Sequence, residues 1–328
     1  MRFVLPLLSS VLLFLSASFA QPNAATLNGQ LWVVNKLGDD VSVIDIQSRT
    51  VIATLPTGKG PHELAIDTNL RWAVVTDYVG GNSLSVFNIA ERKLERTISL
   101  ADYPRPHGVL FMPDQKHVAV SSEGSDNAVI VNVESGVITQ VIATEAGGSH
   151  MVALPASGKV IYTPNMTADN VSVLSVEQGK LLRHIDMPET PEAITVKADN
   201  STLWVGSNKD GWLSVFDTKR DTLKARWKDY TWPYRILYSP DEKTVLVPDL
   251  RQNTLDFYNA GTLTRTRRVQ LPEDVTPKGL TFHPAGEVLF LSLYNVDQVA
   301  VIDVSSGEEL FRLPTGDGPD GIGYVPAN

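Results

Sequence analysis

The sequence predicts an all-β fold, a seven-bladed β-propeller, from the spacing of its repeats and from the pattern of its strands. A short apolar strand that ends at a turn-forming polar residue occurs seven times after Leu31. The turn residues are Asp45, Asn88, Asn132, Ser175, Asp217, Asn259 and Asp303, and successive ones lie 42 to 44 residues apart. This period is typical of propeller blades. The repeats show no convincing helical period, which favours an all-β structure.

Each repeat contains four short strands in a constant order. In the first repeat the predicted strands are residues 31–35, 41–46, 50–56 and 62–67, with turn residues between them. Tight turns such as Pro113-Asp114-Gln115-Lys116 lie on one side of the repeat, and longer, more varied loops lie on the other. We therefore expect four-stranded blades and one loop-rich face.

The two ends of the repeat array complement each other. The first predicted strand corresponds to the second strand of a blade, and Asp320–Val325 is a first strand without a blade of its own. We expect the N- and C-terminal strands to pair, because such pairing closes the ring and leaves no open seam. The chain has no cysteine, so burial and closure must stabilise it without disulfides.

The first residues resemble an export signal. Residues 1–20 combine Arg2, an apolar run and Ser18-Phe19-Ala20, which predicts a signal peptide cleaved after Ala20 and a periplasmic or secreted protein. Residues 21–29 form a predicted lead, and residues 30–328 form the propeller. No later apolar stretch reaches the roughly 20 residues of a membrane span.

A net charge of −9 opposes general nucleic-acid binding. We expect the protein to be a monomer.

The second strands of the repeats end in a shared four-residue pattern. It reads WVVN from Trp32, VVTD from Val74, YTPN from Tyr162, VGSN from Val205, LVPD from Leu246 and SLYN from Ser292, with a divergent AVSS from Ala119. With Pro106-His107-Gly108 at a strand start, the pattern resembles the YVTN-type β-propeller repeat family of exported bacterial and archaeal proteins, over residues 30–326. The resemblance implies the propeller fold. Related propellers include binding proteins, lactonases and lyases, so the activity stays open.

The starts of the innermost strands define a candidate site at one mouth of the central channel. The residues there are His62, His107, His150, Glu192, Tyr234, Lys278 and Asp320. In a closed ring Asp320 neighbours His62, so Asp320, His62, His107, His150 and Glu192 follow one another on five blades. Imidazoles and carboxylates suit zinc or a similar divalent ion. Alternatively, the repeat pattern itself favours Pro-His at this position, and each imidazole forms a hydrogen bond with a carbonyl of a neighbouring loop.

The other side of the mouth is predicted to be basic and aromatic. The candidate ligand-binding residues are Trp227, Tyr230, Trp232, Tyr234, Arg235, Arg251 and Lys278, with Lys209 nearby. The cations are suited to a carboxylate or phosphate, and the aromatics to a ring, a sugar or a peptide. Alternatively, the cations pair with Asp210, Asp229 and Asp249, and the aromatics pack a long loop.

No motif in the sequence names a reaction. A Gly-x-Ser-x-Gly elbow, a His-Glu-x-x-His helix and a phosphate-binding glycine loop are all absent from the 328 residues. The sequence therefore favours an exported binding protein that presents the channel mouth to a small ligand or a protein. The alternatives are a metal-dependent lactonase- or lyase-type enzyme and a divalent-metal carrier, both using His62, His107, His150 and Glu192.

Overall fold

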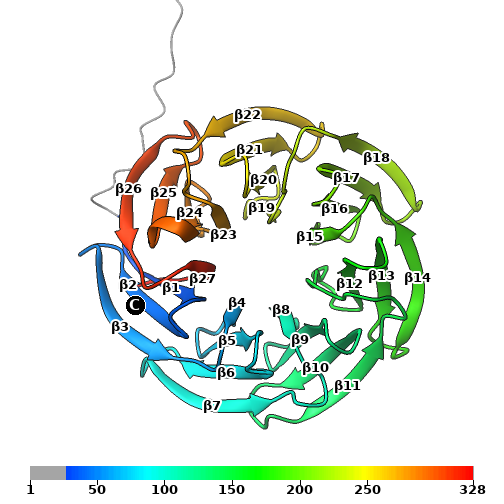
Figure 1. Cartoon of the computed structure of the whole chain (residues 1–328), viewed down its shortest axis with the longest axis horizontal. Helices are drawn as coiled ribbons and strands as arrows, with labels where there is room; N and C mark the ends of the chain where they lie inside the picture. The colour runs from blue at the N-terminus through cyan, green and yellow to red at the C-terminus, as the bar shows by residue number, and fades with distance from the viewer. Residues whose placement is uncertain (1–26, 328) are drawn as a thin grey trace, which may run out of the picture.

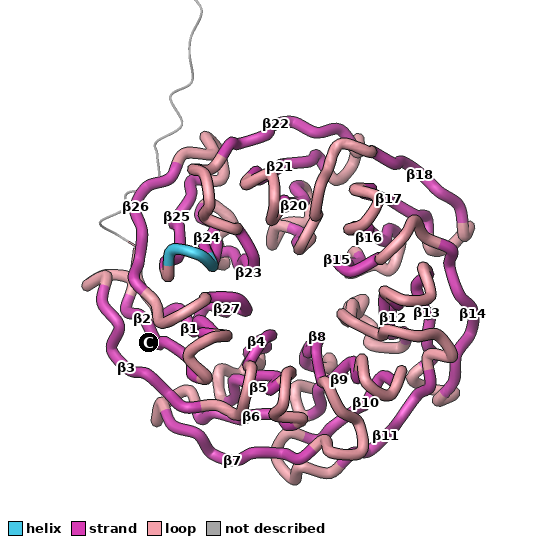
Figure 2. Tube along the Cα trace, in the orientation of Figure 1, coloured by secondary structure: helices cyan, strands magenta, loops and turns pink. Residues whose placement is uncertain are grey.

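The structure is a ring of seven antiparallel sheets around a central channel (Figure 1). The computed structural model describes residues 27–327, so the predicted signal peptide and most of the predicted lead lie outside the described residues. Within the described part, strands and turns account for the fold, with one short 3-10 helix, η1 (Tyr294–Val296), beside β24 (Figure 2). The predicted seven-bladed all-β propeller is confirmed.

The first three blades follow the predicted strand order. Blade 1 contains β27 (Pro319–Val325), β1 (Gln30–Asn35), β2 (Asp40–Asp45) and β3 (Thr50–Pro56). Blade 2 contains β4 (Pro61–Ile66), β5 (Trp72–Asp77), β6 (Ser83–Asn88) and β7 (Lys93–Ser99). Blade 3 contains β8 (Pro106–Phe111), β9 (His117–Ser122), β10 (Asn127–Asn132) and β11 (Ile138–Ala143).

The remaining four blades repeat this order with two irregular inner strands. Blade 4 contains β12 (Val160–Asn165), β13 (Asn170–Ser175) and β14 (Lys180–Asp186), and blade 5 contains β15 (Pro191–Val196), β16 (Thr202–Ser207), β17 (Trp212–Asp217) and β18 (Thr222–Trp227). Blade 6 contains β19 (Leu237–Tyr238), β20 (Thr244–Asp249), β21 (Thr254–Asn259) and β22 (Thr264–Gln270), and blade 7 contains β23 (Pro277–Phe282), β24 (Val288–Leu293), β25 (Gln298–Asp303) and β26 (Glu309–Pro314). Isolated bridges at Ser149 and Ala153 mark the inner position of blade 4, and one at Pro233 extends that of blade 6.

The two ends of the described chain share blade 1. Strand β27 pairs antiparallel with β1, with Leu31 opposite Tyr324 and Val33 opposite Ile322. Leu27, which precedes β1, is buried in the same apolar cluster as Ile322. The predicted closure of the ring by its terminal strands is therefore present.

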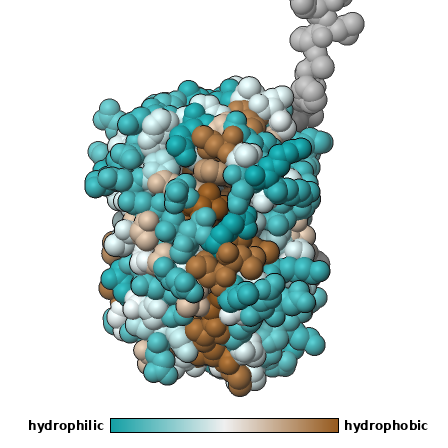
Figure 3. All heavy atoms as spheres, turned by 90° about the vertical axis from the view of Figure 1, so that its right-hand side faces the viewer, coloured by the Kyte–Doolittle hydropathy of each residue, from teal (hydrophilic) through white to brown (hydrophobic). Residues whose placement is uncertain are grey.

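Burial falls from the middle of each blade to its outer edge. All six residues of β5 are buried, whereas five of the seven residues of β7 are exposed. The blades pack on one another through buried aromatics, such as Trp32 of blade 1, whose ring centroid lies 6.1 Å from that of Phe87 in blade 2. The outer wall is largely hydrophilic with a narrow apolar band on the side shown in Figure 3.

The second strands of blades 2 and 6 end in a buried aspartate, Asp77 and Asp249, where those of blades 1 and 4 end in an asparagine. Burial raises the pKa of Asp77 to about 6, although the hydroxyls of Ser83 and Ser85 donate hydrogen bonds to its carboxylate. In blade 1 the corresponding Asn35 donates to Ser42 and accepts from the Gly316 N–H. The amide thus contacts a serine hydroxyl at the equivalent position without a charge, as the donor instead of the acceptor.

We expect Asp77→Asn to stabilise the protein at neutral pH. The folded-state pKa is above the unfolded value of about 3.9, so this group's stability contribution is complete below pH 4 and is lost as the pH rises through 6. At pH 7.5 the variant should gain up to about 3 kcal/mol, since one pKa unit corresponds to about 1.36 kcal/mol. Urea unfolding at pH 7.5 and pH 4 should show a gain only at the higher pH.

Asp249→Asn is the matched control at the same position of blade 6. Its carboxylate accepts hydrogen bonds from the backbone N–H groups of Thr231, Trp232, Arg251 and Gln252. An amide nitrogen facing these donors would be unfavourable, so this variant should lose stability. A loss of stability for Asp77→Asn at pH 7.5 would contradict the desolvation argument.

Candidate functional site

The seven predicted mouth residues lie together and are all buried. The inner strands β4, β8, β15, β23 and β27 begin with proline, which lacks an N–H and suits the first position of a strand that borders the channel. The next residue of each strand is a mouth residue, and the bridges at Ser149 and Pro233 place the other two. The buried set is His62, His107, His150, Glu192, Tyr234, Lys278 and Asp320, each less than 10% exposed.

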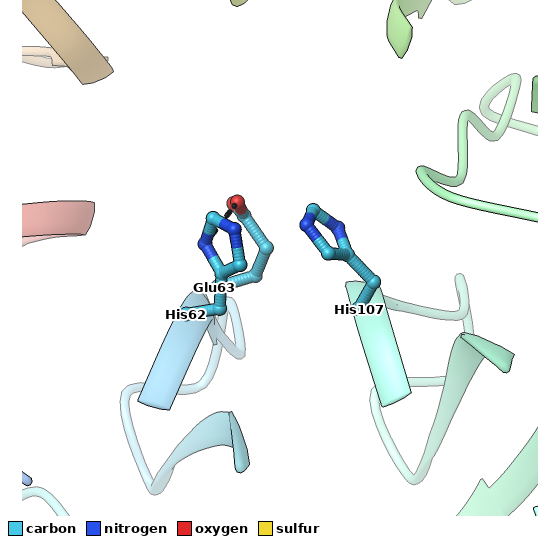
Figure 4. Close-up of side chains that lie close together, drawn as sticks. All are labelled: His62, Glu63 and His107. Carbon is cyan, nitrogen blue, oxygen red and sulfur yellow. Dashed lines mark ion pairs between the residues drawn. The ribbon is translucent and has the colours of Figure 1, made fainter. Parts of the chain in front are cut away.

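His62, Glu63 and His107 form a group of potential metal ligands in the described residues (Figure 4). One ligand atom from each side chain lies within 4.8 Å of the others. The imidazole centroids of His62 and His107 are 4.1 Å apart, and His62 Nδ1 is 3.3 Å from Glu63 Oε1. The two histidines come from adjacent blades, whereas Glu63 follows His62 in β4.

The two imidazoles of this group are kept neutral. Burial, with the nearby cations Lys36 and Arg235, lowers the pKa of His62 well below the usual histidine value. Burial, with the neighbouring His150, does the same to the pKa of His107. Neutral imidazole is the form that binds a metal ion.

A hydroxyl group fixes the backbone between these ligands. Thr76 Oγ1 of β5 accepts a hydrogen bond from the Glu63 N–H and donates one to the His107 carbonyl oxygen, at 3.1 and 2.8 Å. Ser121 of β9 has the equivalent place, accepting from the Gly108 N–H and donating to the His150 carbonyl. The second strand of one blade therefore sets the position of the next blade's mouth residue.

His150 belongs to a second group that touches the first, because its ring centroid lies 3.5 Å from that of His107. Its Nδ1 lies 3.1 Å from Glu123 Oε2 and its Nε2 lies 3.6 Å from Glu192 Oε1. Burial lowers the pKa of His150, but the two carboxylates outweigh it and raise the pKa above the usual value. The same contact with His150, together with Tyr78, lowers the pKa of Glu123 despite burial.

Asp320 forms a third group with cations. Its carboxylate lies 3.2 Å from Lys278 Nζ, 3.7 Å from Lys36 Nζ and 3.9 Å from the Arg235 guanidinium. Burial raises the pKa of Asp320, but these three cations lower it below the usual aspartate value. Arg235 also pairs with Glu63, and burial lowers the pKa of Arg235 to about 10.

The residues of the predicted metal arc lie in the predicted order and touch one another. His62 Nδ1 is 3.2 Å from Asp320 Oδ2, and the ring centroid of His107 is 4.1 Å from that of His62 and 3.5 Å from that of His150. Glu192 continues the arc beside His150, and Glu63, which sequence reasoning missed, joins His62 and His107. Asp320 also faces cations. Sequence reasoning also missed Lys36 and Glu123. Both follow the last residue of a second strand, Asn35 and Ser122, so the repeat offered a signal for them.

The predicted basic and aromatic cluster is divided, and two of its members contact the core between blades 5 and 6. The Trp227 ring stacks on Trp204, with centroids 5.9 Å apart, and Tyr230 donates a hydrogen bond to the buried Asp256. Both aromatics pack in the cluster between blades 5 and 6. Trp227 therefore packs against this core, whereas Tyr230 packs in it and also lines the surface pocket that contains Trp232.

Trp232 and Arg251 lie together at a surface pocket of about 490 Å³. The Arg251 guanidinium carbon is 4.2 Å from the centre of the Trp232 ring, and Lys209 and Asn208 also line the pocket. Tyr234, Arg235 and Lys278 are instead buried at the channel mouth. The predicted ligand-binding residues thus lie at two separate places.

The carboxylate partners expected for the basic side chains are wrong. Lys209 pairs with Glu189, and Lys278 pairs with Asp320. Asp229 contacts Arg265 and Arg268, whereas Asp249 accepts hydrogen bonds from backbone N–H groups. Lys278, at the channel mouth, therefore pairs with another mouth residue and not with a carboxylate of its own loop.

Comparison with known structures gives the same fold at low sequence identity. Hydrazine synthase of Kuenenia stuttgartiensis aligns with a TM-score of 0.72 at 13% identity, covering 82% of this chain and 96% of that one. A functionally unknown protein from Desulfotomaculum acetoxidans aligns with a TM-score of 0.78 at 16% identity, covering 92% of this chain and all of the other.

Two comparisons at the sequence level address relationship. The chain is 22% identical over 254 residues to Antigen Lp49 of Leptospira interrogans, covering 70% of this chain, and it spans about half the length of that curated relative, 55%. Residues 17–205, more than half of the 328, match the family described as Lactonase, 7-bladed beta-propeller. The protein therefore belongs to the lactonase family of seven-bladed β-propellers.

Proposed function

We propose that this protein is an exported binding protein whose channel mouth takes up a small ligand, and that the first such ligand is a divalent metal ion held by His62, Glu63 and His107. The three side chains supply two nitrogen donors and one oxygen donor, a set that zinc and related ions accept.

The observation that carries this proposal is the environment of His107. Its side chain is fully buried, and neither ring nitrogen has a hydrogen-bond partner within the described residues. Leaving a buried polar atom without a partner costs about 1–3 kcal/mol. A metal ion bound through one of these nitrogens would offset part of that cost.

The residues around the three ligands have distinct roles in this proposal. The Arg235 guanidinium pairs with Glu63 and is placed to orient that carboxylate as an outer partner. His150, with both nitrogens facing Glu123 and Glu192, is assigned to the wall of the site rather than to the ligand set.

Calorimetric titration of the chelator-treated protein with zinc, manganese and copper(II) tests the proposal. We expect uptake of about one equivalent of at least one ion, and a loss of affinity of tenfold or more in His107→Ala and in Glu63→Gln. His117→Ala is the control, since His117 pairs with Asp114 near the surface. Absence of uptake, or equal losses in His117→Ala, would contradict the proposal. Melting temperatures separate a loss of binding from a loss of folding.

Export forms part of the same proposal and is supported by the sequence of residues 1–20. Mass spectrometry of the chain recovered from the periplasm or medium should give an N-terminus at Gln21. Recovery of the uncleaved chain in the cytoplasm would contradict it. In the described residues no helix is long and apolar enough to cross a membrane.

A second candidate function is lactone hydrolysis at the same mouth. Family membership favours it, as does the contact of His150 with Glu123, an imidazole and carboxylate suited to assist the attack of water. Lys278 and Arg235 are near enough to stabilise negative charge on the lactone oxygen. Acid release from a panel of five- and six-membered lactones, lost in His150→Ala, would support hydrolysis, and no acid release would exclude it for that panel.

A further inference from the structure

A ring of apolar residues lies directly below the ring of charged mouth residues. The inner strands β4, β8 and β23 have a register shift just after the mouth residue, so the cavity that the apolar residues line fixes their position. Two positions after each mouth residue, all seven inner segments carry leucine, isoleucine or valine, as at Leu64, Val109, Leu280 and Ile322. The channel therefore changes from charged to apolar within about two residues of its mouth.

These apolar residues line a cavity of about 190 Å³. All seven of them contribute to its wall, and the charged residues in its lining, Glu63 and Arg235, pair with each other. Glu63 also belongs to the proposed metal site. The cavity and the mouth site are consequently contiguous.

The mouth above the cavity has an excess of positive charge on one side. Lys36, Lys278 and Arg235 gather around Asp320, and the only other carboxylate that the described ion pairs place with them is Glu63. Three cations thus face two carboxylates. An additional carboxylate from a ligand would balance this group.

We infer that the channel binds a linear alkyl carboxylate, with the carboxylate beside Lys278 and Arg235 and the alkyl chain among the apolar residues below. This deepens the proposed function and rests on it only in placing the ligand at the mouth. An apolar cavity of about 150 Å³ is known to hold benzene. A cavity of 190 Å³ therefore holds an alkyl chain of roughly six carbons.

Calorimetric binding of straight-chain carboxylates from acetate to decanoate tests the inference on the full-length protein. Each added methylene should strengthen binding by up to about fourfold, the effect of burying one methylene group. The gain should stop when the cavity is full. Equal affinities for acetate and hexanoate, or no binding of any member, would overturn the inference.

Two variants of the cavity wall test whether the alkyl chain of the ligand lies in the cavity. Leu280→Phe fills the cavity and should abolish the dependence on chain length, whereas Leu64→Ala enlarges it and should move the best ligand to a longer chain. Leu223→Phe, at a half-exposed position on the outer strand β18, is the control. An unchanged length dependence in both wall variants would place the alkyl chain elsewhere.

Lys278→Met tests the head group. It should weaken binding of every carboxylate by about tenfold while keeping the increase per methylene. Titrations of chelator-treated and metal-loaded protein separate the two proposals. Metal uptake without length-dependent carboxylate binding overturns only this inference, and length-dependent binding without metal uptake overturns only the metal site.

Discussion

Deletion of residues 319–328 is expected to unfold the whole propeller. The deletion removes β27, whose residues pair with β1 and pack beside β4 and β23 in the neighbouring blades. It also removes the buried Ile322 and Val325 from the core and Asp320 from the mouth. A buried strand contributes several kcal/mol, which is comparable to a typical total stability of about 5–15 kcal/mol.

We expect the whole ring to lose stability because the pairing of β27 with β1 joins the two ends of the chain. Without β27, the β1 edge of blade 1 loses its hydrogen-bond partner and blades 2 and 7 lose a packing surface, so every interface between blades weakens in turn. Thermal unfolding followed by circular dichroism measures the effect. Removal of residues 327 and 328 alone, beyond β27, is the control and should leave the melting temperature unchanged. A full deletion that melts within a degree or two of the intact protein would contradict the closure.

The fold could be predicted because the repeat is encoded locally. The period of 42 to 44 residues counts the blades, and the first residue of each inner strand lies at a fixed place within the period. The seven mouth residues therefore followed from the sequence alone. Blade 4 has a less regular inner strand, and there the sequence also departs from its repeat, with Ser149 replacing proline before the mouth residue.

The pairing of side chains within the mouth could not be predicted in the same way. The order of the blades did place His62 between Asp320 and His107, but contacts with other residues depend on how far each side chain reaches across the channel, a property of tertiary packing. Glu63 is a mouth residue only because its side chain reaches Arg235 of blade 6 and His62 beside it. Trp227 resembled a rim aromatic because its loop is unusual, but it stacks on Trp204 and is half-buried.

Asp320→Ala is expected to cost about 3–5 kcal/mol at neutral pH, the usual effect of removing one partner from a buried ion pair. The carboxylate is fully buried, and its loss would leave the Lys36, Lys278 and Arg235 cations facing one another with Glu63 as the nearest compensating charge. Tyr234, whose hydroxyl donates to Asp320, would also lose its acceptor. Asp320→Asn keeps the size of the side chain but not its charge, so it should lose most of the same stability.

The pH dependence separates this charge effect from a loss of packing. Because the folded-state pKa of Asp320 is lowered, its contribution is complete above the unfolded value of about 3.9 and is lost as the pH falls through the lower folded value. The stability difference between the wild type and Asp320→Asn should therefore be constant from pH 5 to 7 and should shrink below about pH 4, as measured by urea unfolding. Asp221→Asn, which removes an exposed pair with Arg183, should cost less than about 1 kcal/mol. A difference for Asp320→Asn that stays the same down to pH 2.5 would show that packing, and not the compensation of the three surrounding cations, accounts for the role of this residue.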